Sequence, residues 1–364
     1  MSRFLQAEID LKALIHNFSV IKAFLNSLKV KCKIIAIIKA DAYGHGAVKI
    51  AQELEKQKVD YLGVAFCSEA VVLRKSGIKS RILVLFDTDI KKVFKYALIP
   101  VIFNFKQAKV LSNEARKRGI ILPVHIKVET GMGRLGIYDN PCKTIKDIAD
   151  LPNLKIEGIM SHLSQAETQD WTLKQIERFK ELKKCLNSIN IKPLFHISNS
   201  AGLIYPEALF DAVRPGLMLY GYSSNKFKEQ IKPCMTVKTK IMDIRKLLKG
   251  TPISYGKTFV TKRDSLIGVI PVGYADGYFR KLSNRAFVMV KGKKVPVVGT
   301  VCMDLTMIDL TDVSNVEIND EVVLLGRSGK EKITADDIAK WAETISYEVL
   351  TSLGSRAKRK YIGI

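Results

Sequence analysis

The chain has 364 residues, and 59 lysines and arginines against 36 aspartates and glutamates give it a formal net charge of +23 at pH 7. This length exceeds one ordinary domain, so two domains are expected. The charge would suit a nucleic-acid binder, but the basic residues are spread along the chain without any nucleic-acid module motif. We therefore expect no nucleic-acid partner.

Neither a signal peptide nor a membrane span is expected. Charged and polar side chains interrupt the apolar positions of residues 1–14, and no apolar run approaches bilayer length. The six cysteines, at positions 32, 67, 142, 185, 234 and 302, are scattered and include no C-x-x-C pair. Neither a disulfide framework nor a zinc site is indicated, and we expect a protein of the reducing cytoplasm, without metal or membrane contact.

Residues 1–222 alternate helical patterns with short apolar runs. Helices are predicted over 11–28, 106–118 and 170–189 from apolar residues spaced three and four apart. Strands are predicted at 34–38, 60–66, 81–86, 98–103, 123–129, 155–161, 194–198 and 212–219. About eight parallel strands in this alternation predict an α/β fold, a (β/α)8 TIM-like barrel over residues 1–225, with a doubly wound sheet as the alternative.

From about residue 226 the pattern changes to short strands with turns between them. One helix, over 335–344, is expected near the end of the chain. Strands are predicted at 237–244, 265–272, 287–290, 295–301 and 321–325. The sequence thus predicts a mostly-β C-terminal domain over residues 226–364.

Lys39 ends the first predicted barrel strand and precedes a turn that contains two glycines, Gly44 and Gly46. A strand of the sheet would hold its amine and aim it beyond the strand end, where a nucleophilic or Schiff-base lysine would sit. A strand-end lysine taken alone more often reaches into solvent, so other residues must decide its role.

Residues 131–136 match the G-x-G-x-x-G pattern of dinucleotide-binding folds. That pattern needs a helix after the glycines and a place after the first strand. Here turn residues follow at 137–141, and the match comes after the fifth strand, so we reject a dinucleotide site. What remains is a glycine-lined turn that presents Arg134 to an anionic ligand.

Two loops resemble the phosphate site that barrels form after strands seven and eight. Residues 196–202 supply small hydroxyl side chains and a helix start, and residues 214–217 include a glycine that lets backbone N–H groups approach a phosphate. Each loop taken alone is weak evidence for a phosphate site, since Ser-Asn-Ser is also a common helix N-cap. With Lys39 they suggest a phosphorylated aldehyde cofactor bound as a Schiff base.

The segment Ile38-Lys39-Ala-Asp-Ala-Tyr43-Gly-His-Gly resembles the pyridoxal-phosphate signature of alanine racemases. Further similar motifs follow in the family's order across both domains: Lys127-Val-Glu-Thr-Gly-Met-Gly-Arg134-Leu-Gly, Ser161-His162, Asn199-Ser200-Ala201, Arg214-Pro-Gly216, Ser254-Tyr255-Gly-Lys-Thr-Phe, Val272-Gly-Tyr274-Ala-Asp-Gly-Tyr, Cys302-Met303-Asp304 and Ile345-Ser-Tyr347. The Lys39 signature is shared with relatives of the same barrel, whereas the Tyr255 and Cys-Met-Asp motifs are more specific.

The resemblance implies a pyridoxal 5'-phosphate enzyme that interconverts L- and D-alanine by two-base proton transfer and supplies D-alanine for peptidoglycan. Lys39 would be the cofactor anchor and the base for D-alanine, and Tyr255 the base for L-alanine. The family pattern assigns cofactor binding to Tyr43, His162, Ser200, Arg214, Gly216, Leu217 and Tyr347, substrate binding to Arg134 and Met303, and substrate entry to Tyr274 and Tyr347.

The resemblance further implies a homodimer with shared active sites, in which Tyr255, Met303 and Tyr274 reach the site of the other subunit. Lys127 matches a lysine that is carbamylated in some relatives, and pairing with Glu129 or exposure to solvent is the alternative. The sequence departs from the common family residues at Glu129, Leu217, Phe279 and Leu305, and none of these changes removes a reacting group. A broader-specificity racemase, a decarboxylase and a non-catalytic cofactor carrier are the alternative functions.

Overall fold

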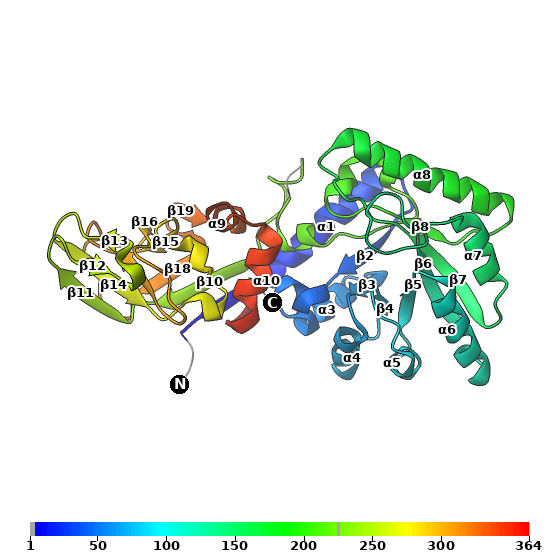
Figure 1. Cartoon of the computed structure of the whole chain (residues 1–364), viewed down its shortest axis with the longest axis horizontal. Coiled ribbons are helices and arrows are strands. Elements are labelled where there is room, and N and C mark those ends of the chain that lie inside the picture. Colours follow the sequence, from blue (N-terminus) through cyan, green and yellow to red (C-terminus); the bar gives the residue numbers. More distant parts are fainter. Residues whose placement is uncertain (1–3, 224–225, 364) are drawn as a thin grey trace. The chain divides into compact units, whose positions relative to one another are not determined.

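The structure, a computed structural model, describes residues 4–223 and 226–363, which form two compact units (Figure 1). One unit, here called the barrel unit, consists of residues 15–40 and 47–232. The other, the β unit, combines the described parts of 1–14, 41–46 and 233–364. The domain boundary that the sequence suggested after residue 225 adjoins residues 224–225, which lie outside the described part of the chain.

The barrel unit contains a sheet of eight strands whose order is β8-β7-β6-β5-β4-β3-β2-β9, with every pair parallel. Because sequential strands are neighbours and the last one pairs with the first, the barrel is confirmed and the doubly wound alternative is wrong. The strands are β2 (Lys33–Ile37), β3 (Tyr61–Val64), β4 (Arg81–Val84), β5 (Ile99–Ile102), β6 (Leu122–Lys127), β7 (Leu154–Met160), β8 (Leu194–His196) and β9 (Ala212–Val213).

The eighth strand is shorter than the predicted 212–219, because the chain turns at Pro215 and Gly216 into the 3-10 helix η3 (Leu217–Tyr220). Its backbone still links the two ends of the sheet. Asp211 N donates to Phe195 O at 2.9 Å, and Arg214 N donates to Ser198 O at 2.9 Å. These bonds place the start of the 214–217 loop beside the residues that follow β8.

Helices follow the barrel strands, and their apolar faces supply much of the buried core. Side-chain caps begin three of them: Asp10 accepts from Ala13 N, Asp89 accepts from Lys92 N, and Asn104 accepts from Gln107 N. The helices are α1 (Leu11–Ser27), α2 (Lys39–Tyr43), α3 (Ala47–Lys56), α4 (Cys67–Lys75), α5 (Ile90–Lys95), α6 (Phe105–Lys117), α7 (Pro141–Ala149) and α8 (Gln169–Ser188), with 3-10 helices η1 (Ala201–Ile204) and η2 (Pro206–Ala208).

The β unit is mostly β, as predicted. Its largest sheet has the order β16-β15-β18-β10-β1-β20, with β19 paired to β18, and a three-stranded and a two-stranded sheet accompany it. The strands are β1 (Gln6–Asp10), β10 (Met235–Lys240), β11 (Asp243–Leu247), β12 (Pro252–Ile253), β13 (Phe259–Val260), β14 (Ser265–Ile270), β15 (Phe287–Val290), β16 (Lys293–Pro296), β17 (Thr306–Asp309), β18 (Glu321–Ser328), β19 (Glu331–Ile333) and β20 (Lys358–Ile362).

Several elements of this unit were not predicted. They are the strands β1, β12, β13, β17, β19 and β20, most of β11, and the second terminal helix α10 (Ser346–Arg356), which follows α9 (Ala335–Ala342). β1 pairs in parallel with β20 and antiparallel with β10, so strands from both ends of the chain share one sheet. Such long-range pairing stabilises segments whose local sequence is too polar to read as strand. The unit also contains η4 (Tyr255–Lys257), η5 (Tyr274–Asp276) and η6 (Arg280–Leu282).

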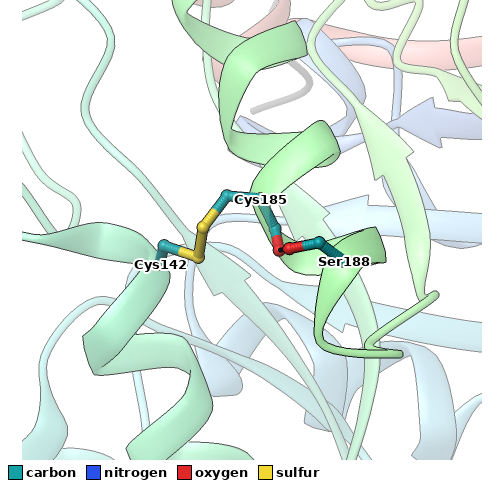
Figure 2. Close-up of a disulfide and its surroundings, with 3 residues drawn as sticks. All are labelled: Cys142, Cys185 and Ser188. Carbon is teal, nitrogen blue, oxygen red and sulfur yellow. Dashed lines mark hydrogen bonds between the residues drawn. A yellow bond between two sulfur atoms is a disulfide. The ribbon is translucent and has the colours of Figure 1, made fainter.

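The sequence indicated no disulfide, and this is wrong for two of the cysteines (Figure 2). Cys142 of α7 and Cys185 of α8 form a disulfide across 43 residues of sequence, with their Cα atoms 6.3 Å apart. Cysteine spacing could not show this pairing, because the barrel makes neighbours of two consecutive helices that lie far apart in sequence. Cys32, Cys67, Cys234 and Cys302 are free.

No helix in the described part of the chain is long and apolar enough to span a membrane.

The disulfide generates a stability prediction. By the chain-entropy relation, closing a loop of 43 residues contributes about 4 kcal/mol to the free energy of unfolding. The double variant Cys142→Ser/Cys185→Ser should lose about this amount in denaturant titrations, and reductant should lower the stability of the wild type alone. Cys32→Ser, which changes a free cysteine, is the control. Six reactive thiols in the unfolded, unreduced wild type would contradict the pairing.

Candidate active site

The carboxyl ends of the barrel strands carry the polar side chains from which a site could be built, as is usual for this fold. Each comes from a different strand or from the loop after it. They are Lys39 after β2, Lys127 at the end of β6, His162 after β7, Ser200 after β8 and Arg214 after β9, and the aromatic Phe86 follows β4.

Lys39 is half-buried, and burial lowers the pKa of its amine below the usual value. Arg134 lowers this pKa further, while Glu69 partly opposes both effects. The Glu69 carboxylate also fixes the local backbone, because it accepts hydrogen bonds from Ala40 N at 2.6 Å and from Ala65 N at 2.7 Å. Lys39 therefore has an amine that gives up its proton more readily than an ordinary lysine, on an anchored backbone.

The four residues after Lys39 form a left-handed turn. The φ angles of Ala40, Asp41, Ala42 and Tyr43 are 52°, 52°, 54° and 53°. Left-handed backbone costs roughly 1–2 kcal/mol for each residue that carries a side chain, so consecutive ones persist only where other contacts hold them.

Contacts within the β unit hold this turn. Arg359 of β20 forms an ion pair with Asp41 at 2.7 Å and donates to Gly44 O at 2.9 Å. Gly44 has a φ of 82°, and a Cβ there would collide with the backbone carbonyl of Leu350 in α10. The ring of Tyr43 is buried and lies 5.9 Å from that of Tyr347. The segment after Lys39 is thus clamped by α10 and β20.

Arg214 is almost fully buried, and burial lowers its pKa to about 9. Nη1 donates to His196 Nδ1 at 2.7 Å and to His196 O at 2.8 Å. Nη2 donates to Ser161 O, to Ile197 O at 3.0 Å and to His162 Nδ1 at 3.3 Å. Within the described residues no carboxylate pairs with this guanidinium, and none of its hydrogen bonds uses Nε.

Arg214 also determines the tautomers of the histidines beside it. Because a guanidinium only donates, Nδ1 of His196 must accept and its Nε2 carries the proton. That Nε2 lies 2.9 Å from Nδ1 of His125, to which it donates. Burial, followed by nearby arginine charge, holds the pKa of His125 at about 3 and the pKa values of His162 and His196 well below 6.5. All three imidazoles are therefore neutral near pH 7.

Arg134 lies on a turn that closes onto β6. Ile137 N donates to Lys127 O at 2.9 Å, and Glu129 N donates to Ile137 O at 3.0 Å. Inside the turn the Glu129 carboxylate accepts from Gly131 N at 2.6 Å, from Met132 N and from Arg134 N at 3.2 Å. Burial alone would raise the pKa of Glu129, but these donors outweigh it and lower the pKa. The exposed Arg134 is thus presented by a turn with an internal carboxylate.

Lys127 is only 2% exposed. Burial lowers the pKa of its amine to about 8, with further lowering by Arg134 and Arg214, while Glu129 acts in the opposite direction. Its pKa is therefore close enough to neutrality for a fraction of the amine to be unprotonated.

The two loops predicted to bind phosphate lie together. Ser200 Oγ accepts from Gly216 N at 2.9 Å and from Met218 N at 3.3 Å, so the N-terminus of η3 faces the residue that precedes η1. Leu217 opens η3 between these two donors. Backbone N–H groups at a helix start and a small hydroxyl are the groups that proteins use to bind phosphate, although helices this short are not sites by themselves.

The β unit carries the remaining predicted residues on loops that are bonded to one another. Thr300 Oγ1 donates to Tyr255 O at 2.9 Å, and Tyr274 N donates to Cys302 O at 3.0 Å. Tyr255, Met303 and Tyr274 are 71%, 55% and 43% exposed, so this loop cluster presents large side chains to its surroundings. Tyr255, Tyr274 and Met303 thus lie on loops that meet at residues 300–303. Elsewhere in the β unit the rings of Tyr43 and Tyr347 are in contact.

Sequence reasoning missed several residues of the barrel cluster. Phe86 is the most central, because Lys39, Lys127 and Arg134 lie 5.5, 5.6 and 5.7 Å from its ring centroid. Its position at the end of the predicted strand 81–86 was the available signal. The other missed residues are Glu69 and His125, whereas Ser161 and His196 stood in predicted motifs without a role of their own.

Known proteins resemble this chain along its whole length, and those that match belong to one family. The profile of the alanine racemase N-terminal domain matches residues 9–224, and that of the alanine racemase C-terminal domain matches residues 234–361. An alanine racemase of Thermodesulfovibrio yellowstonii is 69% identical over 362 residues, which cover 100% of this chain and 99% of that protein.

Solved structures agree as well. Alanine racemase from Clostridium difficile 630 has a TM-score of 0.90 at 34% identity and covers 100% of this chain and 96% of its own. Alanine racemase from Bartonella henselae with covalently bound pyridoxal phosphate has a TM-score of 0.90 at 30% identity, over 99% of this chain and 100% of its own.

The lowered pKa of Lys127 predicts a pH-dependent effect on stability. Below pH 8 the lysine is charged in both folded and unfolded chains, and the shift from 10.5 to about 8 costs the folded state roughly 3 kcal/mol. Lys127→Met should therefore raise the free energy of unfolding at pH 7 in CO2-free buffer. The difference in free energy of unfolding between this variant and wild type should shrink as pH rises from 8 towards 10.5. In that range the folded lysine has lost its proton while the unfolded lysine still binds one, so the wild type gains stability.

The exposed lysine variant Lys117→Met is the control and should leave stability unchanged at every pH. A Lys127→Met advantage that stays constant between pH 7 and pH 9.5 would contradict the lowered pKa.

Proposed function

The chain belongs to the alanine racemase family and is an isomerase that interconverts L- and D-alanine, and we propose that it uses pyridoxal phosphate with Lys39 and Tyr255 as its two bases. The observation that carries the proposal is the lowered pKa of Lys39, the barrel-strand lysine that matches the family's cofactor signature. An amine that loses its proton easily can both attack an aldehyde and accept a proton from substrate.

The residues of the barrel unit fit pyridoxal phosphate chemically. Arg214 still has its Nε–H to donate among the described residues, and it lacks a carboxylate partner, so a neutral ring nitrogen is a suitable acceptor. The Ser200 hydroxyl and the Gly216 N–H suit the phosphate, together with Leu217 at the start of η3. The family pattern assigns the same group to Tyr43 and Tyr347, whose rings lie 5.9 Å apart in the β unit. The related B. henselae racemase carries this cofactor covalently bound.

When bound, pyridoxal phosphate supplies the electron sink that makes the α-proton of an amino acid removable. Lys39 would anchor it and move a proton at one face of the substrate α-carbon, the face from which D-alanine loses its hydrogen. Arg214 would keep its own proton while donating to the ring nitrogen, which weakens the sink. A weaker sink favours return of the proton over side reactions.

Inversion at the α-carbon requires a second base on the opposite face, and we assign this role to the Tyr255 phenol. Proton transfer to or from L-alanine would occur at Tyr255 Oη. His162, which is neutral and accepts from Arg214, would belong to the polar network that tunes this exchange. Arg134 and the Met303 backbone N–H would hold the substrate carboxylate, because a guanidinium fork and an amide are good donors to that group.

We infer that two chains share each site. Tyr255, Met303 and Tyr274 are exposed together with Leu305, which is 37% exposed. A group of large apolar side chains on one loop cluster favours burial by another protein surface. In the family pattern these residues enter the partner's site, with Tyr274 and Tyr347 at the entrance, so we propose an obligatory homodimer.

A cytoplasmic role is part of the proposal. The product D-alanine is a component of peptidoglycan, and its precursors are assembled in the cytoplasm. The Cys142–Cys185 disulfide would then have to persist in a reducing compartment.

Lys127 is also proposed to react with CO2 to give a carbamate, as in some relatives: a bond would form between Nζ and the carbon of CO2, and the nitrogen would release one proton to solvent. A neutral amine is the reactive form, and the lowered pKa supplies it near neutrality. A carbamate would replace a buried cation with an anion beside Arg134. Added bicarbonate should therefore reduce the difference in free energy of unfolding between wild type and Lys127→Met. An unchanged difference would contradict the carbamate.

The shared site can be tested by mixing two inactive variants. Lys39→Ala lacks the anchor and Tyr255→Phe lacks the second base, so each homodimer should racemise alanine at a small fraction of the wild-type rate. After the chains are mixed and allowed to exchange, hybrid dimers contain one site with both residues intact. D-alanine formation should recover to about a quarter of the wild-type specific activity for equal amounts of the two chains.

Two outcomes would contradict the proposal. If the mixture stays inactive although hybrids form, each site is built within one chain. If Tyr255→Phe alone racemises at the wild-type rate in both directions, Tyr255 is not the second base.

A further inference from the structure

Helix α8 buries apolar side chains along most of its length, but its first two turns bury two polar ones. Thr172 and Gln175 are both 0% exposed. The Thr172 hydroxyl donates to Gln165 O at 3.0 Å, just before the helix begins. Burial of an amide lowers stability unless hydrogen bonds satisfy its polar atoms, so the partners of Gln175 decide whether it does more than pack.

On one side Gln175 binds the loop that follows β7. Its Nε2 donates to His162 O at 3.1 Å, and its Oε1 accepts from Ser164 N at 2.9 Å and from Ser164 Oγ at 3.0 Å. These partners determine the orientation of the carboxamide, because exchange of its O and N would place two donors and two acceptors against each other. An apolar side chain of similar shape would leave His162 O and Ser164 N without this partner.

On the other side Gln175 binds the turn that presents Arg134. Its Nε2 also donates to Thr130 Oγ1, at the longer distance of 3.4 Å. Three residues further along α8, Arg178 Nη1 donates to Thr130 O at 3.0 Å. The turn approaches the helix closely at Gly131, where a Cβ would lie 3.3 Å from Cγ of Gln175. Two side chains of α8 thus hold one residue of the turn.

Packing alone does not hold this turn against the helix. A cavity of about 1060 Å³ is lined by residues 128–133 of the turn and by residues of α8 that include Arg178, Glu181 and Leu182. Part of the turn therefore faces open space instead of interlocking side chains, which are what fix a segment inside a protein core. The hydrogen bonds from α8 to Thr130 must supply much of the restraint.

The two loops are also bonded to each other and to Arg214. Thr130 Oγ1 and Ser161 Oγ share a hydrogen bond of 2.6 Å. Ser161 O and His162 Nδ1 both accept from Nη2 of Arg214. Gln175 thus closes a ring of hydrogen bonds that runs from the turn after β6, through Ser161, to the loop after β7 and back through α8.

We propose that Gln175 is a positioning residue of the racemase site, whose carboxamide fixes the turn that presents Arg134 relative to the loop that carries His162. Arg134 would hold the substrate carboxylate and His162 would belong to the proton-transfer network, so a shift between the two loops would misplace the substrate. This proposal rests on the roles proposed above for Arg134 and His162. Gln175 lies outside every motif that carries the family resemblance.

Two substitutions break the link from opposite ends. Gln175→Met keeps an unbranched side chain of similar length and removes all four hydrogen bonds of the carboxamide. Thr130→Val keeps the shape of the turn residue and removes the hydroxyl that Gln175 binds. Thr172→Val is the matched control, because it removes one hydrogen bond from an equally buried residue of α8 that binds Gln165 instead of the two loops.

Steady-state kinetics of the holoenzyme separate positioning from stability. Gln175→Met and Thr130→Val should raise KM for alanine about three- to tenfold with a smaller fall in kcat, because displacement of Arg134 weakens substrate binding more than chemistry. Thr172→Val should lose stability in denaturant titrations and keep the wild-type KM. A wild-type KM in both link variants, or an equal rise of KM in Thr172→Val, would overturn the proposal.

Propionate, which is alanine without its amine, gives a readout that does not depend on proton transfer. In calorimetric titrations of the holoenzyme, its Kd should rise in Gln175→Met by about the same factor as KM. In an Arg134→Gln background Gln175→Met should weaken propionate binding no further, because the two residues would act through one contact. An undiminished further loss would show that Gln175 acts elsewhere and would contradict the proposal.

The same titrations distinguish this proposal from the proposed function. If Lys39 and Tyr255 are not the two bases, racemisation data will show it while the propionate results remain as expected. If Arg134→Gln alone leaves propionate binding unchanged, the carboxylate role of Arg134 is wrong, and the positioning role of Gln175 is overturned with it.

Discussion

The buried guanidinium of Arg214 is the constraint on which the chemistry of the barrel unit depends. A charge removed from water is tolerated only where hydrogen bonds replace its hydration, and here three backbone carbonyls and two imidazoles do so, without a carboxylate among the described residues. Its positive field, added to burial, keeps His162 and His196 neutral and depresses the pKa of Lys127. A carboxylate partner would have satisfied the charge but would have removed these effects.

A second constraint is mechanical and acts next to Lys39. The left-handed turn over residues 40–43 is costly. It persists because Arg359 and α10 of the β unit hold the segment that follows the lysine, and because Gly44 lets the Leu350 carbonyl of α10 approach closely. The turn therefore lowers the conformational stability of this segment. Contacts with residues more than three hundred positions later in the chain compensate for that cost. Strain of this kind is typical of functional sites, and here it immediately follows the residue that would bind the cofactor.

Much of the fold followed from sequence pattern, because alternating helical periods and short apolar runs leave few topologies for eight parallel strands. Lys39, Arg134, Ser200 and Arg214 could be singled out because they follow strands. The pairing of Cys142 with Cys185 could not, since it depends on which helices become neighbours. The convergence on Phe86 was equally hidden, because ring–cation contacts join residues from three separate strand ends. Likewise β1 and β20 are polar strands that form through pairing with distant parts of the chain, β20 with β1 and β1 with both β20 and β10.

The central claim is that Lys39 and Tyr255 act on opposite faces of the substrate. Exchange of the α-hydrogen with solvent deuterium, followed by proton NMR in the Tyr255→Phe variant, tests it most directly. With the tyrosine base removed, the account predicts that D-alanine still exchanges its α-hydrogen at Lys39, without racemising, while L-alanine does not exchange. Equal exchange of both enantiomers, or loss of exchange in D-alanine alone, would contradict the account.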